Sequence, residues 1–209
     1  MASLSSIYIF WYREVLRIWR DKLRIAGSLA MPLLWLLVFG GGFSRIVQLA
    51  PGMDFTKFMF PGIIGMTVLM TSFMSGVSIV WERELGFLKE VLVAPVPRST
   101  IVIGKTLGGA TVAMFQGTLI LALAPLLGVK LTLALVWQLW PLMLLVALAS
   151  AAMGILIASR MKSMEGFQVI MQATIMPMIF LSGVFFPVSN LPPWMNWVVK
   201  INPVTYGVD

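Results

Sequence analysis

The sequence contains no cysteine and no histidine, and only 11% of its 209 residues are charged. The two missing residue types exclude disulfides, thiolate and imidazole metal centres, and every catalytic arrangement built on a Ser–His or Cys–His pair. A water-soluble domain carries about a quarter charged residues, whereas 59% of this chain is hydrophobic. The composition therefore predicts an all-α integral membrane protein.

Stretches without charge predict the membrane spans, because a helix needs roughly 20 apolar residues to cross about 30 Å of hydrocarbon. Arg24 and Arg45 border the first stretch, and Pro187 ends the last one because proline interrupts a helix. Five spans are expected, at residues 25–44, 58–81, 106–129, 137–159 and 166–186.

Residues 1–24 predict an interfacial amphipathic helix ahead of the transmembrane domain at 25–209. At about 100° per residue, Ile7, Trp11, Val15 and Ile18 lie on one side, nearly opposite the arginines. Such a helix anchors to anionic lipid, or it also contacts a cytoplasmic partner as an elbow helix. With the N-terminus inside, eleven of the fifteen Lys and Arg residues fall in cytoplasmic segments, which favours this orientation.

The five expected spans contain no Asp, Glu, Lys or Arg. Ion-coupled transporters and voltage sensors generally keep such residues at membrane depth. Gly104-Lys105-Thr106 matches the end of a phosphate-binding loop, but Ser99 stands where that loop has its first glycine. We therefore expect no ATP site in this chain, so that the energy for any uphill transport comes from another polypeptide.

The connection from Glu82 to Lys105 is the longest expected cytoplasmic stretch after the N-terminus. Its residues favour a short helix at 82–94, which Pro95 and Pro97 end. Three leucines spaced i, i+3 and i+7 form an apolar ridge on it: Leu85, Leu88 and Leu92. The ridge either docks into a groove on a partner or packs back on the ends of the spans.

Residues 82–98 read Glu-Arg-Glu-Leu-Gly-Phe-Leu-Lys-Glu-Val-Leu-Val-Ala-Pro-Val-Pro-Arg. This segment resembles the coupling helix of type-2 (exporter) ATP-binding-cassette transporter permeases. It departs from the family pattern at Phe87, where threonine is common, and at Lys89, where glutamate is common. A second stretch, Ser182–Pro187 followed by Leu191–Trp194 and Asn202–Tyr206, is similar to the end of the family's fifth span and its extracellular re-entrant segment, here at about 187–205.

The resemblance implies a multi-pass permease of a bacterial or archaeal plasma membrane with a cytoplasmic N-terminus. It implies a second permease subunit, as a homodimer, and two cytoplasmic ATPase subunits that hold ATP and Mg, while this chain holds no cofactor. The expected substrate is a hydrophobic or amphipathic drug, lipid or lipid-linked glycan moved outward, and membrane lipids but no nucleic acid are further partners. The complete family fold has six spans, so a chain ending at Asp209 with five is expected to be truncated.

By the same resemblance, the ATPase contact consists of Glu82, Arg83, Glu84, Leu85, Gly86, Leu88, Leu92, Pro95 and Arg98. The leucines would fill a groove, the charged residues would fix orientation, and Gly86 would permit close approach. Arg160, Lys162 and Glu165 are either a second contact or a plain positively charged flank.

The transport pathway is less clearly marked. The second expected span carries Met66, Met70 and Met74 beside Thr67, Thr71, Ser75 and Ser78. There are two interpretations of flexible methionines next to hydroxyls. They line a channel that accepts varied substrates, or they pack in a contact between helices. Gln168 and Gln172 are further pathway candidates, and family likeness makes Phe185 and Phe186 gate candidates. Small residues at four-residue spacing predict packing faces at Gly109, Ala113 and Gly117 and at Ser150, Gly154 and Ala158.

Three other classes compete with this interpretation. A secondary transporter or channel would work without an ATPase, and a membrane scaffold would transport nothing. A membrane-embedded enzyme is disfavoured because histidine and cysteine are absent and the carboxylates lie at membrane edges.

Overall fold

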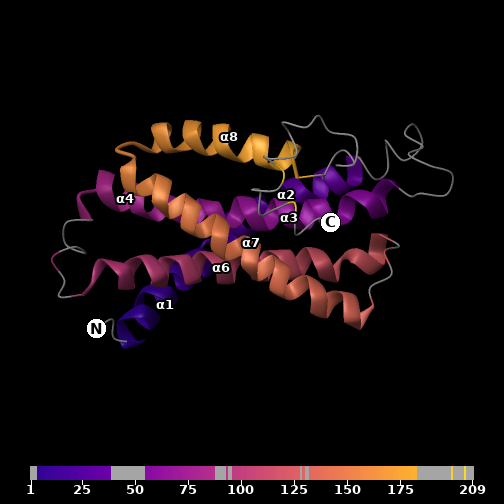
Figure 1. The fold of residues 1–209 in the computed structure, drawn as a ribbon, viewed down its shortest axis with the longest axis horizontal. Coiled ribbons are helices and arrows are strands. Elements are labelled where there is room, and N and C mark those ends of the chain that lie inside the picture. Colours follow the sequence, from indigo (N-terminus) through magenta and orange to yellow (C-terminus); the bar gives the residue numbers. More distant parts are fainter. Residues whose placement is uncertain are drawn as a thin grey trace.

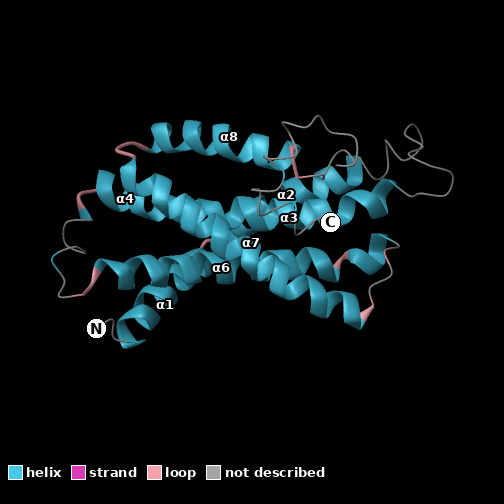
Figure 2. Cartoon of the chain, viewed as in Figure 1, coloured by secondary structure: helices cyan, strands magenta, loops and turns pink. Residues whose placement is uncertain are grey.

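The computed structural model describes residues 4–38, 55–87, 93, 96–127, 129, 132–182, 199 and 205. Within these residues every regular element is a helix (Figures 1 and 2), so the all-α expectation is confirmed for this part of the chain. The elements are α1 (Leu4–Arg20), α2 (Lys22–Leu37), α3 (Phe55–Phe73), η3 (Met74–Gly76), α4 (Val77–Glu84), α6 (Arg98–Ala122), η4 (Ala124–Leu127), α7 (Leu133–Arg160) and α8 (Met164–Phe180).

Two helical stretches among the described residues are long and apolar enough to cross a membrane, Met59–Glu84 and Leu135–Arg160. The first runs through α3, η3 and α4 and extends the second expected span by three residues, to Glu84. A shorter apolar helix covers Ile25–Leu37, in the first expected span. Five membrane passes and a cytoplasmic N-terminus stay predictions.

The helix expected at 82–94 differs from what the structure contains. Helix α4 ends at Glu84, and Gly86 follows with a φ of 75°. The Gly86 amide donates to the Arg83 carbonyl, a helix C-cap that suits glycine because this backbone conformation strains other residues. Glu82–Glu84 are therefore the last turn of the preceding helix, and Gly86 ends that helix. Beyond this break Phe87 and Val93 are helical, and residues 88–92, 94 and 95 lie outside the described residues, so the rest of the expected helix stays a prediction.

The expected packing faces on α6 and α7 are confirmed. A Cβ on Gly154 would meet the backbone of Phe73, and a Cβ on Gly109 would meet the Ser75 side chain. Ala113, Ser150 and Ala158 are fully buried. Helix α7 crosses α3 and α6, as Figure 1 shows, and the small residues let the backbones approach closely.

Helix α1 packs against α6. Positions 104 and 108 are glycines, and a Cβ there would meet Phe10 and Glu14 of α1. Ile18 of the expected apolar side is buried, whereas Tyr8, Tyr12 and Trp19 are exposed. The apolar side of α1 thus faces the helical bundle, and an aromatic side remains on the surface.

Candidate functional site

A cluster of buried charges lies where the end of α4, the start of α6 and the middle of α1 meet. Lys105 of α6 is 1% exposed, and its Nζ lies 2.9 Å from Ser78 Oγ and 3.0 Å from Glu82 Oε1. Glu14 Oε2 is 4.0 Å away, and Arg13 donates to Glu82 Oε1. Buried charges persist when they are paired and hydrogen-bonded, so this cluster ties three helices together.

Glu14 is the least compensated member of this cluster. Burial raises the pKa of its carboxyl above the ordinary value, and Glu82 adds to this, while Lys105, Arg17 and Arg13 counteract part of it. Desolvation favours the neutral form of a carboxyl group. Glu14 therefore takes up a proton more readily than an exposed glutamate.

Arg83 and Glu84, which follow Glu82 in the Glu-Arg-Glu motif, connect α4 to the turn between α7 and α8. The Arg83 guanidinium donates to the Ser159 carbonyl at 2.8 Å and also to the Met161 carbonyl. Glu84 Oε1 accepts from the Met164 amide at 2.7 Å, at the N-terminus of α8. A carboxylate is favourable at a helix N-terminus because it satisfies an unpaired amide and the helix dipole.

We call this region the charged junction; its members are Arg13, Glu14, Ser78, Glu82, Arg83, Glu84 and Lys105. The Glu-Arg-Glu motif thus has partners within this chain, a role that the sequence did not predict for it. Of the other expected ATPase-contact residues, Leu85 is 80% exposed and Gly86 and Arg98 are also exposed. Leu88, Leu92 and Pro95 lie outside the described residues.

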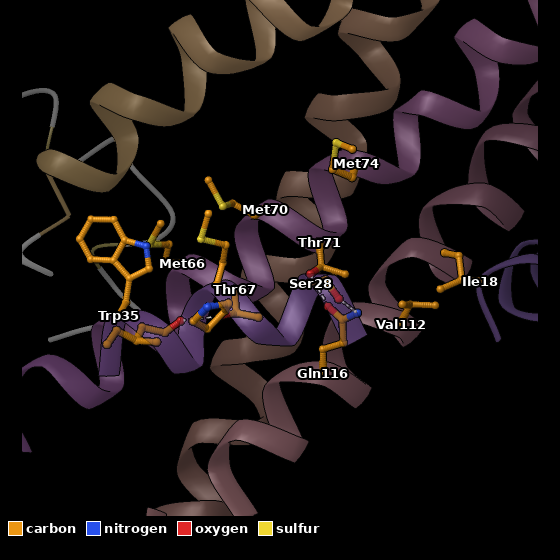
Figure 3. A pocket seen from close by; sticks show the side chains of 14 residues that line it. Ile18, Ser28, Trp35, Met66, Thr67, Met70, Thr71, Met74, Val112 and Gln116 are labelled. Carbon is orange, nitrogen blue, oxygen red and sulfur yellow. Dashed lines mark hydrogen bonds between the residues drawn. The ribbon is translucent and has the colours of Figure 1, made fainter. Parts of the chain in front are cut away.

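A pocket of about 330 Å³ opens between α2, α3 and α6, bordered by the end of α1 (Figure 3). We call it the methionine pocket; its lining residues are Ile18, Gly27, Ser28, Met31, Pro32, Trp35, Ile63, Met66, Thr67, Met70, Thr71, Met74, Val112 and Gln116. The expected methionine row therefore faces a pocket, and Met70 is 41% exposed. None of the described residues that line it is charged.

A chain of hydrogen bonds joins three helices in the pocket wall. Thr71 of α3 donates to Gln116 of α6, and Gln116 Nε2 donates to Ser28 Oγ of α2 at 2.7 Å (Figure 3). Ser28 in turn donates to the Ile25 carbonyl. The pocket thus presents one polar spot on an otherwise apolar surface, an arrangement typical of small-molecule sites.

The structure separates the remaining candidates. Thr67 lines the pocket and donates to its own helix at Ile63, while Ser75 and Ser78 are buried away from the pocket. Gln168 and Gln172 are exposed on α8 and do not line the pocket. Arg160, Lys162 and Glu165 are exposed around the turn from α7 to α8. Phe185 and Phe186 lie outside the described residues.

Sequence reasoning missed three functional contributors: Glu14, Lys105 and Gln116. Lys105 was expected only to mark the end of a span, and Gln116 was not singled out. Two signals pointed to Glu14 and Lys105, and none pointed to Gln116. Glu14 lies between Trp11 and Ile18 on the apolar side of α1, and Gly104 and Gly108 flank Lys105 with a surface that another helix can approach closely.

Two apolar helices of spanning length, packed through small residues and joined by buried charges at one end, suit a helical membrane protein. The chain matches the family model described as ABC-2 type transporter over residues 5–209, and it belongs to this family of membrane permease subunits.

Two relatives place the match in context. The chain is 28% identical to Nodulation protein J of Rhizobium leguminosarum bv. viciae over 204 residues, covering 97% of this chain and 76% of that protein. It is 32% identical over 166 residues to a protein of Escherichia coli K12 named "Probable multidrug ABC transporter permease YbhR", covering 76% of this chain and 44% of that protein. The family resemblance inferred from the two motifs is thereby confirmed.

Proposed function

We propose that this chain moves a hydrophobic or amphipathic substrate outward across a bacterial or archaeal plasma membrane, driven by a separate cytoplasmic ATPase. The observation that carries the proposal is the position of the charged junction. It lies beside the connection between α4 and α6 and on the same helical run as the methionine pocket. A displacement of that connection would reach Met74 through about three helical turns.

The exposed apolar residues of this connection support docking. Leu85 is 80% exposed, Phe87 is 43% exposed, and Val93 is 84% exposed. Arg13 and Phe87 lie close enough for a cation–π contact, with 5.6 Å from the guanidinium carbon to the ring centre. The apolar residues would fill a groove on the ATPase, and the charged junction would hold in place α4, the helix that precedes them.

Orientation and assembly complete the proposal. The Lys and Arg distribution favours a cytoplasmic position for the charged junction. Val169, Met176 and Phe180 of α8 are each more than half exposed, and an apolar helix face of this kind suits a second permease subunit as well as lipid. We propose a homodimer with two ATPase subunits, which bind the ATP and Mg that this chain does not.

One observation favours a second candidate, an ion-driven transporter. Lys105, Glu82 and Glu14 form a buried charged group of the type that proton-coupled carriers use. The two candidates differ in their energy source: the first needs ATP and the ATPase, and the second needs an ion gradient alone.

Reconstitution into proteoliposomes separates them. Transport of a neutral fluorescent hydrophobic probe, Nile red, is measured with the permease alone under a proton gradient and with the ATPase plus ATP. ATP-dependent movement that Leu85→Asp or Leu88→Asp abolishes, together with loss of ATPase binding, is expected. Leu4→Asp, at a leucine that is 85% exposed at the start of α1, is the control and should retain binding. Movement driven by the gradient without the ATPase would contradict the proposal.

A further inference from the structure

We infer that the methionine pocket binds an uncharged amphiphile whose polar end both donates and accepts hydrogen bonds, such as a carboxamide. Because this assignment rests on the proposed function, it narrows the substrate class of the same permease. Three features of the pocket carry it: the absence of charge from its lining, the hydrogen-bonding state of its polar side chains, and the adaptability of its methionines.

The lining excludes a charged group on the part of the ligand that enters. None of the fourteen lining residues is Asp, Glu, Lys or Arg. An ionised group entering the pocket would lose its hydration without gaining a counter-ion, which costs far more than burying a neutral polar group. The phosphates of a lipid-linked glycan therefore find no partner in this lining.

The hydrogen-bond chain defines what the polar spot can offer. The Thr71 hydroxyl donates its hydrogen to Gln116, and the Ser28 hydroxyl donates its hydrogen to the Ile25 carbonyl. A primary amide has two hydrogens, and Gln116 Nε2 uses one of them on Ser28. The second amide hydrogen and the oxygen lone pairs on Thr71 and Gln116 are left for a ligand, which would have to reach Gln116, a 2% exposed residue, from inside the pocket. A carboxamide, which presents one acceptor and two donors, complements this set.

The body of the ligand meets adaptable apolar surface. Met66, Met70 and Met74 occupy successive turns along one wall, and Trp35 faces the same space (Figure 3). Thioether side chains adjust to irregular shapes and contact aromatic rings favourably. A volume of about 330 Å³ lies at the lower end of small-molecule pockets. The site thus tolerates varied apolar bodies and selects on the charge and hydrogen-bonding of the polar end.

Binding is tested on the full chain in phosphatidylcholine nanodiscs, without ATPase or nucleotide. The probes are 4-bromo-1-naphthamide and 4-bromo-1-naphthoate, which share a ring and differ in the charge of the polar end. Bromine quenches nearby tryptophan fluorescence, and the quenching that disappears in Trp35→Phe reports occupancy of the pocket. Empty nanodiscs give the correction for partition into lipid.

Saturable quenching by the amide, at least tenfold tighter than by the carboxylate, is the expected result. Gln116→Leu should weaken amide binding about three- to tenfold, as expected for one net hydrogen bond. Gln138→Leu is the matched control, because Gln138 is exposed on α7 and does not line the pocket, and it should leave binding unchanged.

Equal affinity for the two probes in the wild type, or no quenching that depends on Trp35, would overturn the inference. The wild-type comparison decides even if Gln116→Leu fails to fold. If the variant folds and binds the amide as the wild type does, the inference also fails. Selective amide binding without ATP-driven transport would instead contradict the proposed function alone.

Discussion

The charged junction and the methionine pocket lie on one helical run from Phe55 to Glu84, yet they are built by opposite rules. At the junction, each charged group has a fixed partner on another helix, and Lys105 alone joins α6 to Glu82 and Ser78. In the pocket, the lining is uncharged and its methionines are flexible. The difference teaches that one end of the run suits transmission of a displacement and the other suits adaptation to a ligand.

The 3-10 segment η3, at Met74–Gly76, lies between the two regions. The Ser72 hydroxyl donates to the Val68 carbonyl before this segment, and the Ser78 hydroxyl donates to the Ser75 carbonyl within it, contacts that bend helices. A Cβ on Gly76 would meet the backbone of Gly154 in α7. In the proposed mechanism, movement at the junction would therefore reach the pocket through a segment that α7 holds closely.

The largest expected effect is the loss of stability when the buried cation of the charged junction, Lys105, is removed. Lys105→Met leaves Glu82 and Glu14 buried without their shared partner, and loss of one member of a buried pair costs about 3–5 kcal/mol. We expect thermal unfolding in detergent to show a destabilisation of that order. Lys162→Met, at an exposed lysine, should change the unfolding temperature little.

A variant in which the buried charges of the junction are all neutralised tests whether unpaired charge causes this loss of stability. Adding Glu82→Gln and Glu14→Gln to Lys105→Met should recover part of the lost stability, because no uncompensated charge then remains buried. An unfolding temperature near that of the wild type for Lys105→Met alone would show that the cluster does not tie the helices together.

The variant expected to have the next largest effect changes the contact between α7 and the end of α3. Gly154→Ala places a Cβ against the Phe73 carbonyl, and overpacking of this kind costs about 1–3 kcal/mol. Gly27→Ala is the matched control, because no atom lies within 4 Å of its Cβ position. It should stabilise α2 by about 0.5–1 kcal/mol, as alanine favours the helix. Equal unfolding temperatures for the two variants would refute the close packing.

The pocket should tolerate change better than the junction. Met70→Leu conserves volume, so its cost in stability should stay below about 1.5 kcal/mol, while the loss of a flexible side chain should narrow the range of ligands. Competition of several hydrophobic amides for transport measures that range. If Met70→Leu lowered the free energy of unfolding as much as Lys105→Met does, the pocket would be no more tolerant of substitution than the junction.

The smallest expected effect is the pH dependence of Glu14. Because its pKa is higher in the folded than in the unfolded state, the folded state binds more protons and stability falls as pH rises from the unfolded pKa, about 4.3, through the folded pKa. Glu14→Gln should flatten the unfolding temperature across this window. A wild type and variant with parallel pH profiles would contradict the burial of the carboxyl.

Sequence reasoning predicted much of the fold, because charge-free length and small-residue spacing depend on local composition. The methionine row and the packing faces of Gly109, Gly154 and Ala158 could be predicted for that reason. The charged junction could not, because Glu14, Glu82 and Lys105 are far apart in the chain and meet only through packing of α1 on α6. The break at Gly86 was missed because helix propensity outweighed the glycine in that interpretation.

Labelling of a single cysteine tests the central claim most directly, since these 209 residues contain none. Val93→Cys, in the exposed connection between α4 and α6, is treated in intact cells and inverted vesicles with an impermeant maleimide, and then with a cross-linker in the presence of the ATPase. The account predicts labelling only from the cytoplasmic side and a covalent adduct with the ATPase. Labelling from the exterior, with no adduct, would contradict it.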